Sequence, residues 1–254
     1  MSGPEVPRPV VDWGAPLSQT ARPLRTLFTG YLVVIGLGLL MSFAQILFTH
    51  GMADGELGLS VDDVVYSYYG NREGSRLEAK LGGSMKLMAD EQERAALIKW
   101  VRQGSPQETW ATDVKPIVDA KCVRCHSVMP GIPDYSTYEG LTVVTAIDEG
   151  ATVPTLARVS HVHLFGIAFI FFFVCGIFTL TTGIAPWVKA TAIALPYAFL
   201  TLDVFSWWAT KWVPELAWLT IVGGVGYSSA TAFMILTSLY QLWWPARRRA
   251  EARD

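Results

Sequence analysis

Residues 162–188 have the sequence VHLFGIAFIFFFVCGIFTLTTGIAPWV and contain no charged side chain. A helix needs about 20 consecutive, mostly apolar residues to cross the hydrocarbon core of a bilayer. This stretch is long enough to do so. Because a chain inside lipid must satisfy its own backbone hydrogen bonds, the stretch predicts a transmembrane helix.

Three further runs have the same character. Residues 27–48 and 216–244 contain no charged side chain, and residues 190–209 contain only Asp203. The composition of the whole chain also indicates a membrane protein, since 51% of its 254 residues are hydrophobic and ten are tryptophan. Its mean hydropathy is +0.32. We therefore predict an all-α membrane protein with a first transmembrane helix within 26–50 and three more within 160–245.

Flanking charge predicts the orientation of these spans. Cytoplasmic loops are enriched in Lys and Arg. Basic residues precede the first run and follow the last, which places segment 1–25 and the basic tail 246–254 in the cytoplasm. Residues 51–159 then lie on the opposite side as one small domain. The residues concerned are Arg8, Arg22 and Arg25 before the first run, and Arg247, Arg248, Arg249 and Arg253 after the last.

The segment between the first two runs has a helical, loop-rich pattern. Its strongest predicted helix covers residues 90–103, with Asp90 as N-cap, Glu93 as the capping-box partner and Gly104 as the stop. The apolar residues recur at helical spacing, which predicts a stripe packed on an apolar neighbour. The stripe consists of Ala95, Leu97, Ile98 and Val101, with Trp100 extending it.

Within the same segment, Cys122, Cys125 and His126 form the motif CxxCH. This spacing is typical of covalent haem c attachment, in which both sulfurs form thioethers and the histidine is the proximal iron ligand. A zinc half-site would need a second ligand pair, and the only other cysteine, Cys175, lies in an apolar run. A thioredoxin-like motif would need a βαβ pattern, which is not visible. The sequence predicts one covalent haem c.

The preceding residues resemble the last part of a small cytochrome c. Gly82-Gly83-Ser84-Met85, then Met88, come before the helix predicted from Asp90. In that family CxxCH comes first and the methionine later, so this chain resembles a cytochrome c in permuted order. The resemblance implies Met85 as the distal iron ligand. Met88 is an alternative, and His161 or His163 could instead reach the iron from the membrane boundary.

Four polar residues mark the outer boundary of the spans. His50 ends the first run, His161 and His163 open the second, and Asp203 is the only acid within a span. Acids inside a membrane are costly and suggest a function such as proton transfer. These residues could form a quinol-oxidising site, or the histidines could be interfacial polar anchors.

Tryptophans and glycines predict how the helices sit and pack. Trp207, Trp208 and Trp212 are expected to anchor the outer interface in an aromatic belt. Small residues let helices approach closely. We therefore expect close helix contacts, within this subunit or against another, at Gly223, Gly224 and Gly226 in the last run and at Gly30, Gly36 and Gly38 in the first.

These observations predict a membrane-bound monohaem c-type cytochrome of a bacterial inner membrane, with its haem domain periplasmic and both termini cytoplasmic. It would be a one-electron transfer subunit of a respiratory or photosynthetic complex, rather than a catalyst by itself. Its partners would be other subunits, a soluble electron carrier, lipid and quinol. The alternatives are a quinol-oxidising subunit or an assembly subunit whose haem is a staple or sensor.

Other function classes leave no trace in the sequence. It has no P-loop, dinucleotide fingerprint, nucleophile elbow or zinc-protease motif. The net charge of −2 and the absence of a basic stripe argue against nucleic acid as a partner.

Overall fold

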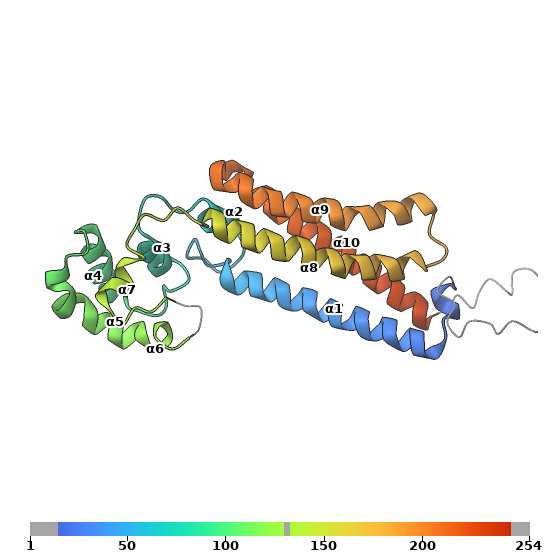
Figure 1. Cartoon of the computed structure of the whole chain (residues 1–254), viewed down its shortest axis with the longest axis horizontal. Helices are drawn as coiled ribbons and strands as arrows, with labels where there is room; N and C mark the ends of the chain where they lie inside the picture. Colours follow the sequence, from blue (N-terminus) through green and yellow to red (C-terminus); the bar gives the residue numbers. More distant parts are fainter. Residues whose placement is uncertain (1–14, 130–132, 245–254) are drawn as a thin grey trace, which may run out of the picture. The chain divides into compact units, whose positions relative to one another are not determined.

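The computed structural model describes residues 15–129 and 133–244, and every regular element within them is a helix (Figure 1). The chain divides into two compact units. Unit 1 comprises Met1–Phe43, Arg158–Val204 and Ile221–Asp254, and unit 2 comprises Ala44–Ala157 and Phe205–Thr220. The predicted all-α class is confirmed. Segment 1–14 and the tail 245–254, which include Arg8 and Arg247 to Arg253, lie outside the described residues.

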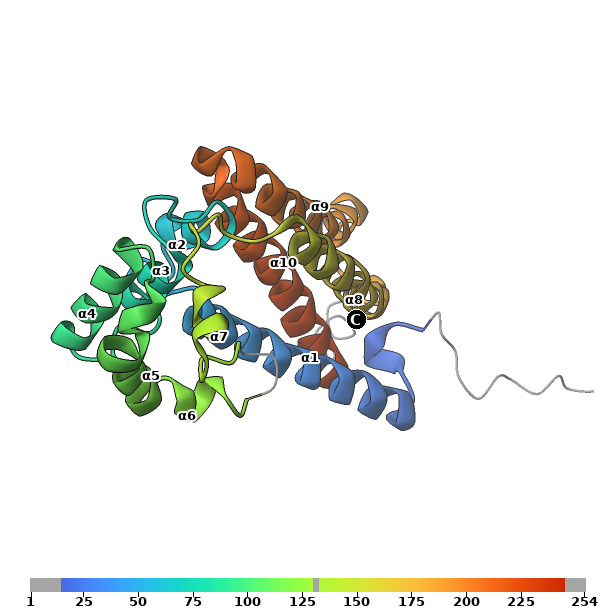
Figure 2. The ribbon, with the colours of Figure 1, turned by 60° about the vertical axis from the view of Figure 1, so that its left-hand side comes forward.

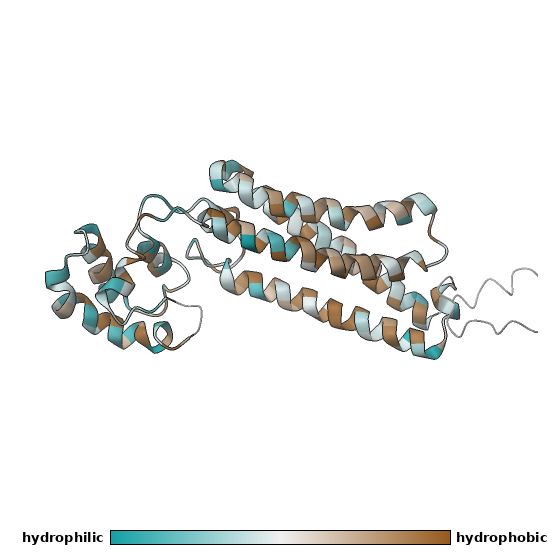
Figure 3. Cartoon of the chain, in the orientation of Figure 1, coloured by the Kyte–Doolittle hydropathy of each residue, from teal (hydrophilic) through white to brown (hydrophobic). Residues whose placement is uncertain are grey.

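Four helices of the described chain are long and apolar enough to cross a membrane, as predicted. Hydrophobic residues are densest along α8 (Figure 3). The four helices are α1 (Arg22–Thr49), α8 (Val153–Thr179), α9 (Pro186–Trp212) and α10 (Trp218–Trp243), the last preceded by the short helix η4 (Pro214–Leu216).

The second span differs from its predicted bounds at both ends. It begins at Val153 rather than near Val162, and it ends at Thr179 rather than continuing to Val188. A turn interrupts the apolar run at Gly183, whose φ of +76° favours glycine. The ammonium of Lys189 donates to the carbonyls of Thr179 and Thr181 at 2.9 and 2.7 Å, satisfying groups that the helix end leaves exposed.

Within unit 1, α9 and α10 pack with backbones in close contact. A Cβ atom added to Gly223 would lie 2.6–2.8 Å from Cβ, Cα and N of Asp203, and one added to Gly226 would lie 2.4 Å from the ring of Phe199. The prediction of close packing is confirmed at these two positions. Gly224 makes no such contact within the described chain, since an added Cβ would meet nothing within 4 Å.

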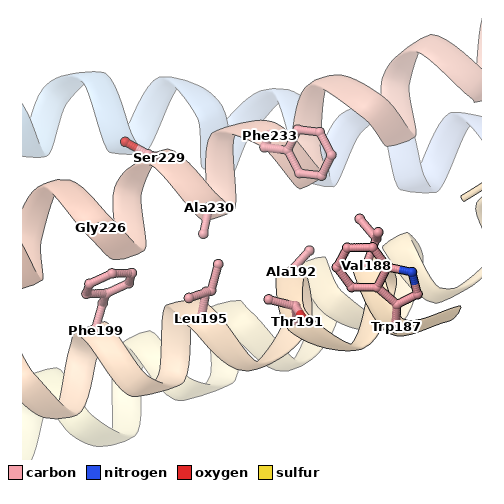
Figure 4. Close-up of a pocket in the computed structure, with 10 residues that line it drawn as sticks. All are labelled: Trp187, Val188, Thr191, Ala192, Leu195, Phe199, Gly226, Ser229, Ala230 and Phe233. Atoms are coloured by element: carbon pink, nitrogen blue, oxygen red, sulfur yellow. The ribbon is translucent and has the colours of Figure 1, made fainter. Parts of the chain in front are cut away.

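A shallow groove of about 450 Å³ runs between the same two helices (Figure 4). Its lining holds no charged side chain and only two hydroxyl groups. The lining residues are Trp187, Val188, Thr191, Ala192, Leu195 and Phe199 of α9, and Gly226, Ser229, Ala230 and Phe233 of α10.

Helix α1 contacts the rest of unit 1 mainly through its first third. Its buried residues are Leu24, Phe28 and Leu32. The hydroxyl of Tyr31 donates to the carbonyl of Ile170 on α8 at 3.2 Å. Three glycines of α1 make no close helix contact within the described chain, since a Cβ added to any of them meets nothing within 4 Å, and their packing against another subunit stays a prediction. They are Gly30, Gly36 and Gly38.

The described part of unit 2 contains six short α-helices, which Figure 2 labels. Buried residues of unit 2 form a hydrophobic core. The helices are α2 (Val61–Tyr68), α3 (Arg76–Gly82), α4 (Glu91–Arg102), α5 (Lys115–Lys121), α6 (Val123–His126) and α7 (Tyr138–Thr142), with 3-10 turn η2 (Gln107–Thr109) and π-helical turn η3 (Trp110–Val114) before α5. The core consists of Leu77, Leu81, Leu97, Trp100, Trp110, Val114, Val118 and Leu141.

The strongest helix predicted in this segment is confirmed as α4. Asp90 and Glu93 form the predicted capping box, and Gly104 follows the helix with a φ of +87°. The buried stripe differs in one member: Leu97 and Trp100 are buried, whereas Ala95 is exposed.

The corner between α9 and α10 belongs to unit 2. Trp207 stacks on Tyr68 with ring centroids 5.8 Å apart, and Lys211 donates to the carbonyl of Glu149 at 3.1 Å. Trp207 is only 5% exposed, so its predicted role as a lipid-facing anchor is wrong. Trp212 is exposed, as an anchor should be.

Candidate functional site

The CxxCH motif lies where α5 runs into α6 (Figure 2). The backbone N–H groups of Cys125 and His126 both donate to the carbonyl of Cys122, at 3.1 and 2.9 Å. The motif therefore forms one helical turn. Residues three and four apart on a helix share a face, so this turn presents both thiols and the imidazole on the same side.

The two thiols have different surroundings. Cys122 is half-buried and packs against the core of unit 2, whereas Cys125 is exposed, and neither is in a disulfide. Burial, with a smaller effect of the Glu93 carboxylate, raises the pKa of the Cys122 thiol. Both sulfurs remain available for covalent attachment.

His126 is held on its edge and on its face. Its Nδ1 lies 3.1 Å from the carbonyl of Pro133, and its ring stacks on that of Tyr135 with centroids 4.2 Å apart and planes 15° apart. Because a carbonyl can only accept, Nδ1 carries the hydrogen and Nε2 keeps its lone pair for a metal. Backbone hydrogen bonding of this kind is what orients metal-binding histidines.

Apolar side chains in unit 2 remain exposed beyond what its core covers. They occur in the turn before α4, directly after the CxxCH motif, and at residues 143 and 147. A large apolar cofactor would find in unit 2 both covalent anchors and uncovered hydrophobic surface, and the residues present fit a haem c. The exposed residues at these three places are Met85, Leu87, Met88, Val128, Met129, Val143 and Ile147, and unit 2 also exposes Leu57, Val61 and Val153 elsewhere.

Met85 and Met88 lie in the turn between α3 and α4. Met85 donates its backbone N–H to Lys80, and Met88 donates to Met85, so a hydrogen-bonded turn carries both side chains. Their exposed fractions are 37% and 58%. Both thioethers belong to unit 2, as does His126.

The glycines of this turn explain its position. A Cβ added to Gly83 would lie 2.7 Å from the carbonyl oxygen of Met52 and 2.8 Å from that of Ala53, whereas one added to Gly82 would meet nothing within 4 Å. The turn carrying both methionines is therefore pressed against the loop that follows α1.

The histidines at the predicted membrane boundary have separate surroundings. His161 contacts Phe165, with ring centroids 5.0 Å apart, and Nδ1 of His163 lies 2.9 Å from the carbonyl of Val159. Both belong to unit 1, and His50 belongs to unit 2. Among the described residues, no group of three or more His, Cys, Asp or Glu side chains could hold a metal ion.

His50 follows α1 directly. Its Nδ1 lies 2.9 Å from the hydroxyl of Ser67, which donates to the carbonyl of Asp63 at 2.7 Å. Burial, followed by the positive charge of Lys80, lowers the pKa of His50, and the Asp63 carboxylate opposes this shift. Asp203 is 4% exposed on α9, where its backbone meets Gly223.

Three residues of structural importance escaped the sequence-based prediction. Pro133 and Tyr135 hold His126, and the fully buried Asp63 accepts the N–H groups of Ala53, Asp54 and Ser60. The spacing of the motif does not indicate the contacts of His126, because each depends on how the chain folds after the motif.

Comparison with known families locates a match in the membrane part of the chain. A family model described as a transmembrane helical domain matches residues 136–250, a range that includes α7 to α10 and begins after His126. No curated protein and no solved structure matches the chain. The family match and the four apolar helices identify a membrane-embedded helical protein.

Proposed function

We propose that this chain is a membrane-bound monohaem c-type cytochrome that transfers single electrons within a respiratory or photosynthetic complex. The observation that carries the proposal is the turn Cys122–His126, which combines two thiols on one face with an imidazole whose Nε2 is left for iron. The helices of unit 1 anchor it in the membrane.

Attachment of the haem needs no further reactant. Each thiol would add across one vinyl C=C bond, so that a sulfur–carbon bond would form and the thiol hydrogen would pass to the neighbouring carbon. When bound, the haem would supply a one-electron couple whose potential depends on its protein ligands and burial. Cys122 and Cys125 would hold it, and His126 would bind the iron.

The opposite axial position is proposed for Met85, with Met88, His161 and His163 as the other candidates. Unit 2 supports a methionine, because it contains both thioethers together with His126. A thioether ligand raises the reduction potential above that of a bis-histidine haem.

The proposed orientation places unit 2's helical domain on the periplasmic side of a bacterial inner membrane and both termini in the cytoplasm. Within unit 1, the guanidinium of Arg25 lies 5.6 Å from the ring of Trp243, so the start of α1 and the end of α10 meet. Arg22 and Arg25 at that end favour the cytoplasm. The partners would be membrane subunits, lipid and a soluble electron carrier on the periplasmic side.

A haem stain on a denaturing gel tests the covalent attachment. We expect the wild-type chain to stain, and Cys122→Ala combined with Cys125→Ala to lose the stain completely. Cys175→Ala is the matched control, since this third cysteine is buried on α8 beside Met234 and should leave staining unchanged. A wild-type chain that is expressed with haem attachment machinery and does not stain would contradict the proposal.

A further inference from the structure

We propose that Tyr135 is a positioning residue that fixes the plane of the His126 imidazole, and with it the direction of the proximal iron ligand. The parallel stack of the two rings carries the inference. It rests on the proposed function, because the imidazole must be an iron ligand for its orientation to matter.

A ligand imidazole has one torsion that the CxxCH turn leaves open, which is rotation about its Cβ–Cγ bond. The bond from Nδ1 to the Pro133 carbonyl restrains one edge of the ring. A single hydrogen bond at 3.1 Å still permits the ring to rock about it. Stacking adds a flat surface against the ring face, and aromatic pairs attract each other beyond the effect of their burial. The two contacts together select one ring plane.

Tyr135 is itself held rigidly enough to serve as this surface. Its backbone N–H donates to the carbonyl of His126 at 3.2 Å. Its half-buried ring packs against the core of unit 2, as do Cys122 and Val123. Burial, and then the neighbouring Cys122, raises the pKa of the Tyr135 hydroxyl, so this side chain is neutral at physiological pH. Tyr135 and the CxxCH turn therefore pack against the same hydrophobic core.

The stack leaves the ligating atom accessible. The lone pair of Nε2 lies in the plane of the imidazole, whereas Tyr135 covers a face of that ring. Contact with the face restrains rotation without competing for the metal. The phenol hydroxyl takes no part in this role, and only the aromatic ring is required.

The experiment uses the full, haem-loaded chain in detergent and records the electron paramagnetic resonance spectrum of the ferric form, whose g values depend on the ligand plane. We expect Tyr135→Phe to match the wild type and Tyr135→Leu to shift and broaden the signal. Tyr138→Phe is the control, since Tyr138 packs in the same core and bonds to Ser105, and it should leave the g values unchanged. Wild-type g values in Tyr135→Leu, or an equal shift in Tyr135→Phe, would overturn the role of the ring.

A measurement on the haem-free chain covers the case in which Tyr135→Leu does not fold. Nuclear magnetic resonance of the wild type and of Tyr135→Phe should show His126 ring protons moved upfield by the stacked ring. Unshifted His126 protons in both would refute the stack. Absence of covalent haem from the wild type overturns the proposed function as well, whereas a stained chain with unshifted protons overturns the Tyr135 role alone.

Discussion

Met85 is the residue proposed as the sulfur ligand of the haem iron. We expect Met85→Ala to lose the absorption band that reports sulfur bound to ferric haem and to lower the reduction potential, because a thioether favours the reduced iron. Met88→Ala is the matched variant, three residues along the same turn, and should retain the band. Optical spectra of the purified proteins decide the assignment, and a band retained in Met85→Ala would exclude Met85.

A single residue, His50, is expected to make the free energy of unfolding depend on pH. Burial lowers its pKa in the folded chain below the ordinary value of about 6.5, so the unfolded state binds its proton first. Unfolding free energy should therefore be unaffected by His50 above pH 6.5 and should fall as the pH drops from there toward the folded pKa.

The matched variant for this prediction is His50→Gln, which cannot titrate and keeps a polar group near Ser67. Thermal unfolding of both proteins in detergent between pH 7.5 and pH 5 should show a stability difference that shrinks, or reverses in favour of the variant, as the pH falls. A difference that stays constant with pH would contradict the role assigned to burial of His50.

At the scale of elements, the close approach of α10 to Asp203 of α9 depends on the absence of a Cβ at Gly223. Gly223→Ala would force a methyl group against the backbone of Asp203, and overpacking of this kind costs about 1–3 kcal/mol. Its neighbour Gly224 has open space, so Gly224→Ala should be neutral or slightly stabilising. Thermal melts of the two variants should separate clearly. Equal melting temperatures would mean that the helices can move apart without cost.

Element prediction succeeded where one local pattern decided the outcome. Four apolar runs and the Asp90–Glu93 capping box are each contained in a short stretch of sequence, and all are confirmed. It was wrong where the outcome depends on distant partners. Trp207 was expected to anchor the outer interface in an aromatic belt, yet it stacks on Tyr68 and is buried. Gly224 faces away from the helix that Gly223 contacts, which composition cannot show.

The same distinction applies to the candidate site: local spacing predicts one part of it and not the other. The spacing of Cys122, Cys125 and His126 is itself a helical i, i+3, i+4 pattern, so their common face could be predicted. The contacts of His126 with Pro133 and Tyr135 require the chain after the motif to fold back over it, which the spacing does not encode.

At the scale of the whole molecule, the proposed orientation can be measured with single cysteines. A membrane-impermeant maleimide applied to intact cells should label Glu108→Cys, on an exposed turn before α5, and should label Ala185→Cys only after lysis. Ala185 lies between α8 and α9, where the proposed topology is cytoplasmic. The parent chain gives the background, since the proposed haem attachment would consume its motif thiols. The reverse labelling pattern would invert the topology.

The corner between α9 and α10 has a consequence for biosynthesis. Unit 2 includes Phe205–Thr220, and Lys211 from this segment donates to Glu149 while Trp207 stacks on Tyr68. A ribosome makes the CxxCH turn long before it makes these residues. The helical domain can thus begin to fold early, but it is completed only after α9 has been synthesised and the chain has turned toward α10. A nascent chain stopped before residue 205 therefore carries every predicted haem-attachment residue on an incompletely folded domain.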